Sequence, residues 1–146
     1  MLIVIQRVSE ARVDIEQETV GKINQGLMIL CGFEPNDSTQ TIDKMLEKCI
    51  NYRIFDDGQG KMNLSLKDIQ GGLLLVPQFT LMAETQKGLR PSFSKAAPPE
   101  LGRQLFDHLL TRASQMYPNT QSGCFGANMQ VYLCNDGPVT FLLQFN

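Results

Sequence analysis

Hydrophobic and polar residues alternate along the first part of the chain. Residues 2–15 and 19–22 follow the two-residue period of half-buried strands, and residues 26–31 form a continuous apolar run that is typical of a buried strand. Asp37 or Ser38 can then cap a helix. The apolar residues after this cap recur at the spacing of one helical stripe: Ile42, Met45, Leu46, Cys49 and Ile50. We therefore expect three strands followed by a helix.

In the middle of the chain the hydrophobic pattern again passes from that of a strand to that of a helix. Residues 56–60 (Asp-Asp-Gly-Gln-Gly) predict a tight turn, and residues 73–81 form the most hydrophobic predicted strand. Pro98 and Pro99 open a second helix, which ends before Pro118. The buried stripe of this helix is predicted at Leu101, Leu105, Leu109, Ala113 and Met116.

The last part of the chain predicts two strands, residues 129–134 and 139–145, joined by a hairpin-type connection at 135–138. Together these elements indicate an α+β fold, in which two helices pack on a curved, mostly antiparallel sheet or small barrel. We expect residues 1–146 to form a single domain, since a chain of this length with 42% hydrophobic residues can bury one core. The apolar strand 141–145 is a candidate for covering a sheet edge with a second copy, which predicts a homodimer.

Charge and hydropathy narrow the class of protein. The net charge of -2 and the pI of about 5.3 disfavour a broad, sequence-independent nucleic-acid-binding surface. No segment resembles a signal peptide or a membrane span, so we expect a soluble, cytoplasmic protein without membrane contact. Residues 86–95 contain three cations, an aromatic ring and no acid, and are a candidate for local RNA contact. A solvated surface loop is the alternative interpretation of this segment.

Side chains that usually build catalytic or metal sites are scarce. The four cysteines lie far apart in apolar patterns, without a C-x-x-C pair, so we expect buried, reduced thiols. His108 is the only histidine. It falls in the middle of the second helix, and we expect it at the surface or at the boundary of the core. We therefore expect no metal site and no cofactor. The motifs of serine hydrolases, P-loop proteins, dinucleotide-binding proteins and zinc proteases are also absent from the sequence.

Two segments place turn-forming and polar residues beside hydrophobic strands. They are residues 75–81 (Leu-Val-Pro-Gln-Phe-Thr-Leu) and residues 135–140 (Asn-Asp-Gly-Pro-Val-Thr). At such places backbone amides can face a ligand instead of a neighbouring strand, which indicates a site built largely from main chain. Thr80 carries a hydroxyl, but no activating base lies beside it in the sequence, so a hydrogen-bonding or packing role is favoured over a nucleophilic one.

The same two segments resemble the motifs of bacterial D-aminoacyl-tRNA deacylases, long called D-tyrosyl-tRNA deacylases. Residues 77–81 are similar to the family's Ser-Gln-Phe-Thr-Leu motif, and residues 135–140 match its Asn-Asp-Gly-Pro-Val-Thr motif. The likeness runs along the whole chain. It includes segments 6–8, 51–55, 61–63, 87–93, 97–101 and 125–131.

The resemblance implies a homodimeric hydrolase, with its active site at the subunit interface, that cleaves the ester joining a D-amino acid to the terminal adenosine of tRNA. In such enzymes the peptide corresponding to Gly137-Pro138 is cis and enters the partner's active site. Its carbonyls leave no room there for an L side chain, so L-aminoacyl-tRNA is rejected. A main-chain wall of this kind is physically reasonable, because X-Pro bonds adopt the cis form at low cost and glycine allows close approach.

The resemblance also implies a catalytic group made of Gln78, Phe79 and Thr80. The amides of Phe79 and Thr80 would stabilise the tetrahedral oxyanion, and the ribose 2′-hydroxyl of the substrate would help to activate water. Two supporting roles follow, Arg7 for the Gly-Pro loop and Met129 for the adenosine end of the substrate. The basic segment would meet tRNA phosphates through two further residues, Lys87 and Arg90.

One position departs from the family pattern, because Pro77 replaces the family's serine in the substrate-binding segment. We expect Pro77 where the strand's hydrogen bonds end or at a sheet edge, since proline has no N–H to donate. A related group that acts on mischarged L-alanyl-tRNA has proline at this place, but its following Gln-Ala-Thr differs from residues 78–80. The alternatives are therefore a relaxed-chirality deacylase of L-alanyl-tRNA or glycyl-tRNA, and a non-catalytic RNA-binding dimer.

Overall fold

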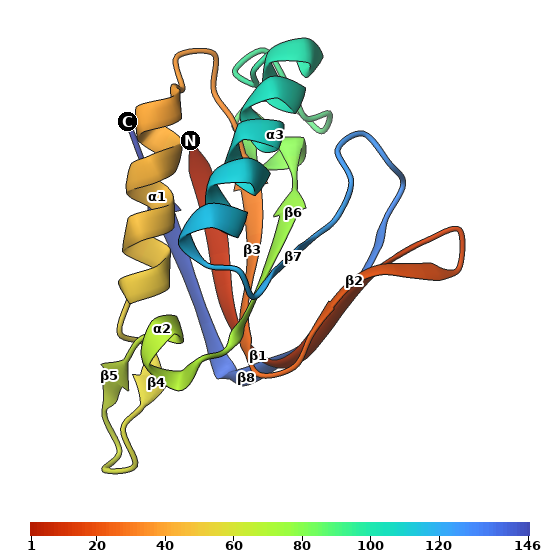
Figure 1. The fold of residues 1–146 in the computed structure, drawn as a ribbon. Helices are drawn as coiled ribbons and strands as arrows, with labels where there is room; N and C mark the ends of the chain where they lie inside the picture. The colour runs from red at the N-terminus through yellow and green to blue at the C-terminus, as the bar shows by residue number, and fades with distance from the viewer.

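The main sheet is built around one long N-terminal strand in the computed structural model, which describes residues 1–146 (Figure 1). β1 (Leu2–Ile15) pairs antiparallel with β8 (Gln130–Gln144) along one edge. Along its other edge β1 pairs antiparallel with β3 (Gly26–Gly32) near its start and with β2 (Glu18–Ile23) near its end. The three strands expected at the start of the chain are therefore confirmed.

Two parallel strands extend the sheet beyond β3. β6 (Gly72–Pro77) pairs with β3, and β7 (Thr120–Ser122) pairs with β6. The sheet curls so strongly that β2 approaches β7. The approach is close at Gly21, where a Cβ atom would lie only 2.6 Å from the carbonyl oxygen of Ser122. The curved α+β sheet is confirmed, although it mixes parallel with antiparallel pairs. A separate small hairpin is formed by β4 (Phe55–Asp56) and β5 (Met62–Leu64).

Two long helices pack against the sheet, as the periodicity predicts. In the predicted stripe of the second helix, however, Leu101 is only half-buried and Met116, near the helix end, is exposed. α1 (Thr39–Asn51) begins after Ser38, whose hydroxyl accepts a hydrogen bond from the Thr41 amide at 3.3 Å. α3 (Pro99–Met116) begins with proline in its first turn. Two short helical elements were not predicted, the single turn α2 (Leu66–Ile69) and the 3₁₀ turn η1 (Phe79–Met82), nor were the short strands β4, β5 and β7. None of the helices combines the length and the apolar character needed to cross a lipid bilayer.

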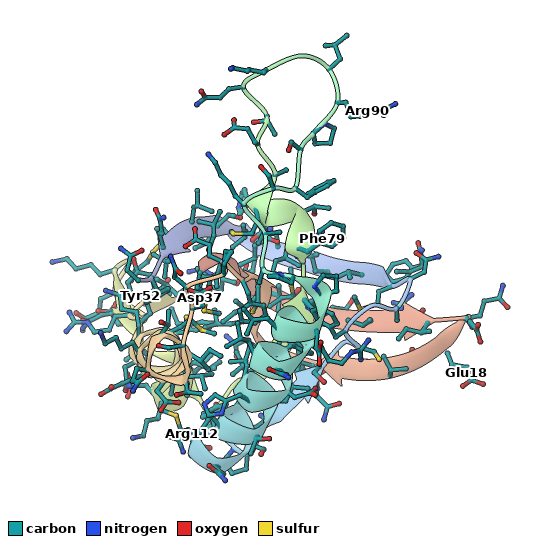
Figure 2. All side chains as sticks on the ribbon, turned by 90° about the horizontal axis from the view of Figure 1, so that it is seen from above. Glu18, Asp37, Tyr52, Phe79, Arg90 and Arg112 are labelled. Atoms are coloured by element: carbon teal, nitrogen blue, oxygen red, sulfur yellow. The ribbon has the colours of Figure 1, made fainter.

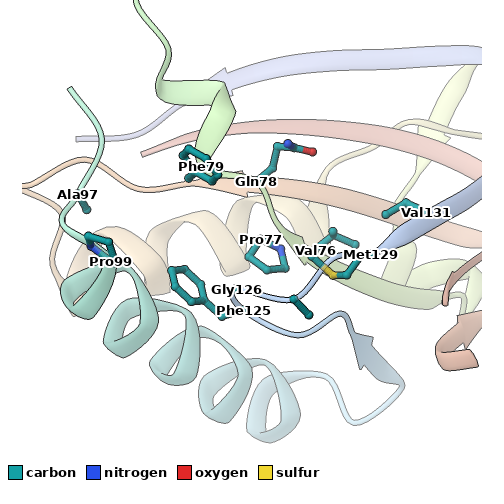
Figure 3. A pocket seen from close by; sticks show the side chains of 11 residues that line it. Val76, Pro77, Gln78, Phe79, Ala97, Pro99, Phe125, Gly126, Met129 and Val131 are labelled. Atoms are coloured by element: carbon teal, nitrogen blue, oxygen red, sulfur yellow. The ribbon is translucent and has the colours of Figure 1, made fainter. Parts of the chain in front are cut away.

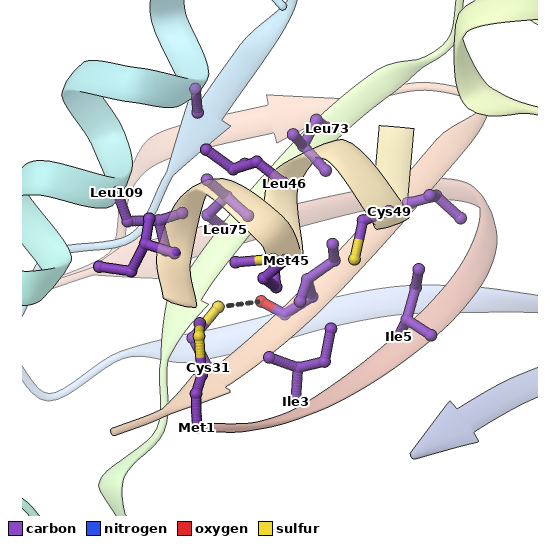
Figure 4. Close-up of a cluster of buried hydrophobic side chains, with 14 of the residues drawn as sticks. Met1, Ile3, Ile5, Cys31, Met45, Leu46, Cys49, Leu73, Leu75 and Leu109 are labelled. Atoms are coloured by element: carbon purple, nitrogen blue, oxygen red, sulfur yellow. Dashed lines mark hydrogen bonds between the residues drawn. The ribbon is translucent and has the colours of Figure 1, made fainter. Parts of the chain in front are cut away.

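Both faces of the central strands are buried, but by different partners. The larger core lies between the sheet and the two long helices, where Met45, Leu46 and Leu109 meet the strands (Figure 4). A smaller core on the other face is formed by strand residues, including Met28 and Leu74. Because β3 and β6 are covered on both faces, their sequences are continuous apolar runs instead of alternating patterns.

Two strand boundaries differ from the sequence prediction. β6 ends at Pro77 and the chain turns into η1, so the predicted strand over residues 73–81 is too long. The predicted hairpin at 135–138 is wrong, because both halves of β8 pair with β1 and not with each other. The register of this pairing shifts between Gln6 and Val8, where extra residues of β8 bulge out of a continuing strand. A second shift, between Val8 and Glu10, places one extra residue on β1.

The cysteines divide into two environments. Cys31 and Cys49 are buried, and burial raises the pKa of both thiols, that of Cys49 to about 12. Cys124 and Cys134 are exposed, so the expectation of buried thiols is wrong for these two. Cys134 occupies an outward position of the alternating edge strand β8, which local hydrophobicity did not reveal. His108 lies in the middle of α3 and is half-buried, at the boundary between core and surface, as expected. Its Nε2 atom lies 3.7 Å from a carboxylate oxygen of Asp43.

Candidate active site

A cavity of about 440 Å³ opens where β6 ends (Figure 3). One wall is the passage from β6 into η1, and another is the loop between β7 and β8. The start of α3 closes a further side. The lining consists of Val76, Pro77, Gln78, Phe79, Ala97, Pro99, Phe125, Gly126, Ala127, Met129 and Val131. Gln78 supplies the only polar side chain among these residues, so the cavity suits a ligand with a flat or apolar surface.

The end of β6 leaves two backbone amides without acceptors. The Gln78 amide donates to the Cys31 carbonyl at 2.7 Å, which is the last bond of the ladder with β3. The amides of Phe79 and Thr80 donate to no other group of the protein. This is expected of the first residues of a helical turn, whose N–H groups have no partner within the turn. Two hydrogen-bond donors are therefore free at the edge of the cavity, where Phe79 is a lining residue and Thr80 follows it directly in the chain.

The side chains of this segment show no activated nucleophile. Gln78 Nε2 donates a hydrogen bond to Thr80 Oγ1, and no carboxylate or imidazole accepts the proton of that hydroxyl. Phe79 leaves 58% of its surface exposed. No group of three or more His, Cys, Asp or Glu side chains gathers anywhere in the chain in a way that could hold a metal ion. The chemical capacity of the segment lies mainly in its amides.

Met129 is fixed in the cavity by its sulfur. Its Sδ atom accepts a hydrogen bond from the Cys124 amide at 3.4 Å. Gly123 leaves room for this sulfur, because a Cβ atom there would lie only 2.6 Å from it. Next to it, the ring of Phe125 packs against Phe106 of α3, with ring centroids 6.3 Å apart. No role was predicted for Phe125, although an aromatic residue inside a glycine-containing segment before a strand was a usable signal.

Gly137 and Pro138 lie in the bulge of β8 and do not line this cavity. The peptide between them is cis, and Gly137 has a φ of +128°. Arg7 binds the preceding residue, since its Nε donates to the Asp136 carbonyl at 3.2 Å, while its Nη1 donates to the Ile54 carbonyl at 2.8 Å. The structure therefore places Arg7 beside the Gly-Pro segment, as the resemblance implies.

Side chains on the other side of the bulge complete this support. Asn135 Nδ2 donates to Thr140 Oγ1 at 2.9 Å, and Asn135 Oδ1 accepts from the Val139 amide at 3.1 Å. Gln6 Nε2 also donates to Thr140 Oγ1, at 3.3 Å. The Gly-Pro segment is thus held from both ends by polar side chains.

Lys87 and Arg90 lie on a loop that projects from the body of the protein above η1 (Figure 2). Neither residue forms an ion pair, whereas Lys95 lies 2.6 Å from a carboxylate oxygen of Glu84. This hydrogen bond lowers the pKa of Glu84 and raises the pKa of Lys95. The basic segment therefore offers two free cations, not the three counted in the sequence.

A family model described as D-Tyr-tRNA(Tyr) deacylase matches residues 4–144. The chain belongs to this family. It is 79% identical to the D-aminoacyl-tRNA deacylase of Legionella pneumophila (strain Lens), over 99% of this chain and 100% of the relative. It is 62% identical to the D-aminoacyl-tRNA deacylase of Pseudomonas fluorescens (strain SBW25), over 96% and 97% of the two chains. The solved structure of the c-Myc DNA unwinding element binding protein has a TM-score of 0.93, 36% identity, and coverage of 99% and 98%.

The match to the D-Tyr-tRNA(Tyr) deacylase family includes both of the segments that carried the resemblance. Within one chain these segments lie in different places, residues 77–80 at the cavity and residues 135–140 in the bulge of the edge strand.

Proposed function

We propose that the chain hydrolyses the ester bond between a D-amino acid and the terminal ribose of tRNA, and leaves L-aminoacyl-tRNA intact. Membership of the deacylase family, with relatives of this activity at 79% and 62% identity, supports the reaction. The observation that carries the mechanism is the pair of free amides, on Phe79 and Thr80, beside a cavity with almost no polar side chains. Because aminoacyl-tRNA is consumed by translation in the cytoplasm, a substrate of this kind implies that the protein acts there.

The reaction needs little from side chains. Water adds to the ester carbonyl, and the carbonyl oxygen becomes an oxyanion that the two amides stabilise. The intermediate then expels the ribose oxygen, which takes up a proton, and releases the free D-amino acid. The neighbouring ribose hydroxyl helps to activate the water, which would restrict the reaction to RNA. Gln78 holds the Thr80 hydroxyl, so its role is to fix the segment.

The cavity suits the terminal adenosine of the substrate. Phe125 and Met129 offer an aromatic ring and a polarisable sulfur to a nucleobase, and both line the cavity. Lys87 and Arg90 are free of carboxylate partners and are assigned to phosphates of the tRNA.

Chiral selection requires a second copy of the chain. Gly137 and Pro138 are absent from the cavity of their own chain, while Phe79 and Leu142 expose 58% and 65% of their surfaces. We assign these exposed apolar groups to the interface of a homodimer. In this dimer the Gly-Pro segment of one chain forms a wall of the other chain's active site. This wall leaves room for the hydrogen of a D-amino acid but not for an L side chain.

One assay tests the reaction. Purified protein is mixed with matched D-tyrosyl-tRNA and L-tyrosyl-tRNA, and the released amino acid is measured with and without a chelator. We expect rapid release of D-tyrosine only, and no effect of the chelator. Equal rates on the two isomers would contradict the chiral wall, and a loss of activity in chelator that zinc restores would contradict a mechanism without metal.

The dimer is tested with an outward-facing residue of β8. Phe141 is unsuitable, because its ring packs against Tyr52 with centroids 5.7 Å apart. Leu142→Asp should yield a monomer in sedimentation velocity and abolish turnover, whereas Val20→Asp, on an exposed position of β2, should change neither. An active Leu142→Asp monomer would show that each chain has a complete site.

Pro77 favours a second candidate function. Proline at the cavity wall is the feature shared with the deacylases of mischarged L-alanyl-tRNA, so L-alanyl-tRNA and glycyl-tRNA belong in the same assay. The third alternative is a non-catalytic RNA-binding dimer, and the solved structural relative carries the name of a DNA-binding protein. The net charge of -2 and the few free cations of the basic loop disfavour it, and turnover of any aminoacyl-tRNA would exclude it.

A further inference from the structure

The ring of Phe79 has an aromatic neighbour outside its own segment. The centroids of Phe79 and Phe93 lie 5.0 Å apart, and the planes of the two rings meet at 59°. Both rings are partly exposed, Phe79 by 58% and Phe93 by 39%, so this pair is not part of the buried core. It joins the segment with the free amides to the base of the projecting loop (Figure 2).

The base of this loop is closed by main-chain and ionic contacts. Glu84 and Ser92 exchange two backbone hydrogen bonds, of 2.7 Å and 3.1 Å. Lys95 binds the Glu84 carboxylate at 2.6 Å, and the Ala97 amide donates to the Phe33 carbonyl at 2.9 Å. Phe93 lies between these contacts in the chain, so its backbone is held by the base of the loop independently of the segment that its ring touches.

Phe79 has weaker support of its own. η1 is a short 3₁₀ turn, and its bonds from the Leu81 amide to the Gln78 carbonyl at 3.2 Å and from the Ala83 amide to the Thr80 carbonyl at 3.1 Å are local to the turn. The amide of Phe79 itself makes no bond. An oxyanion donor works only when its direction is fixed before the reaction, so a contact that holds residue 79 has catalytic value.

We propose that Phe93 is a positioning residue, which holds the ring of Phe79 and thereby directs the Phe79 amide at the oxyanion. This inference rests on the proposed deacylase function and deepens it. The aromatic pair also links the catalytic amide to the loop that carries Lys87 and Arg90. Phosphate contacts to the loop therefore steady the amide while tRNA is bound.

The test compares three variants on two substrates, D-tyrosyl-tRNA and the short ester 3′-O-D-tyrosyl-adenosine, which lacks the rest of the RNA. Phe93→Leu removes the ring, and we expect kcat to fall about tenfold on both substrates, with KM changed by less than about twofold. Phe93→Tyr keeps the ring and should retain the wild-type kcat. Leu89→Ala, on a fully exposed position of the same loop, is the control and should leave both constants unchanged.

A double variant tests whether the two rings act together. Phe79→Leu combined with Phe93→Leu should be no slower than Phe79→Leu alone, because the second ring has nothing left to hold. Additive losses would overturn the proposal. So would an unchanged kcat in Phe93→Leu, or a rise of KM for tRNA alone with normal turnover of the short ester, since Phe93 would then serve only RNA binding. An inactive wild type would instead overturn the proposed function itself, and this inference with it.

Discussion

Residues 77–80, at the end of β6, and residues 135–140, in the bulge of β8, both have main chain that leaves the sheet pairing, but the two segments are held in different ways. At residues 77–80 the strand ends, and the amides of Phe79 and Thr80 have no acceptors. At residues 135–140 the strand continues through a bulge, which Arg7 and Asn135 bind from both sides. The first segment is suited to donate hydrogen bonds, and the second is suited to present a fixed shape.

This difference determines which substitutions each segment tolerates. Where the chemistry belongs to an amide, a side chain can change with little effect as long as the N–H remains and keeps its direction. Where the function is shape, the supporting side chains and the space around the backbone become important. Substitutions that separate main chain from side chain therefore test the comparison directly.

The largest effect is expected from removing an amide at the first segment. Thr80→Pro deletes the N–H in the first turn of η1 and should lower kcat on D-tyrosyl-tRNA by about 100-fold to 1000-fold. Thr80→Ala retains the amide and should keep kcat within about threefold of wild type. Single-turnover kinetics of both variants measure this difference. An inactive Thr80→Ala, together with an acyl-enzyme trapped on the wild type, would show that Thr80 is the nucleophile.

The second effect concerns space around the Gly-Pro segment. In Gly137→Ala the new Cβ would lie 2.7 Å from Val139 Cγ2 and 3.1 Å from Arg7 Nη2, at a φ of +128° that L residues rarely adopt. The segment must shift, and kcat/KM for D-tyrosyl-tRNA should fall by about 100-fold. Gly58→Ala is the control, because Gly58 also has a positive φ but open space around it. Normal activity and selectivity in Gly137→Ala would mean that this segment does not contact the substrate.

A smaller effect is expected from the side chain that supports the same segment. Arg7→Lys cannot bridge the carbonyls of Asp136 and Ile54 with one ammonium group, so the segment loses an anchor. The ratio of D to L turnover should fall about tenfold, and the free energy of unfolding by about 1–2 kcal/mol. Arg12→Lys on the same strand, whose guanidinium pairs with Asp14 at 3.3 Å, should keep the ratio. If the D to L ratio of Arg7→Lys matches wild type, the segment is rigid without Arg7.

The contrast also explains how much of the fold the sequence predicted. Periodicity located the first three strands and both long helices, because the pattern of each element reflects which of its faces is buried, whatever that face packs against. The continuity of β8 was missed, since Gly137 and Pro138 are typical of a hairpin turn as well as of a bulge. Only the pairing with β1, whose residues lie far away in the sequence, distinguishes the two.

The site was predicted in the same uneven way. The family resemblance assigned Gln78, Phe79 and Met129 to the site, and the structure places these three residues at one cavity. No sequence pattern, however, shows that an amide lacks an acceptor. The wall formed by Phe125 depends on packing against Phe106 of α3, a contact between elements that local patterns do not encode. The role of Phe93 is hidden for the same reason, because its partner Phe79 lies on another segment.

The smallest effect concerns Pro77, where the chain departs from its family. Pro77 is the last residue of β6, as expected for a residue that cannot donate to the next strand, and it lines the cavity. Pro77→Ser adds a hydroxyl to this wall while the Gly-Pro segment stays intact. If the hydroxyl positions the substrate, turnover of D-tyrosyl-tRNA should rise by about twofold to threefold with an unchanged D to L ratio. Parallel assays with L-alanyl-tRNA provide the decisive control. A wild type active on L-alanyl-tRNA that becomes D-specific after Pro77→Ser would make Pro77 the specificity switch, and the relaxed-chirality function would then replace the one proposed above.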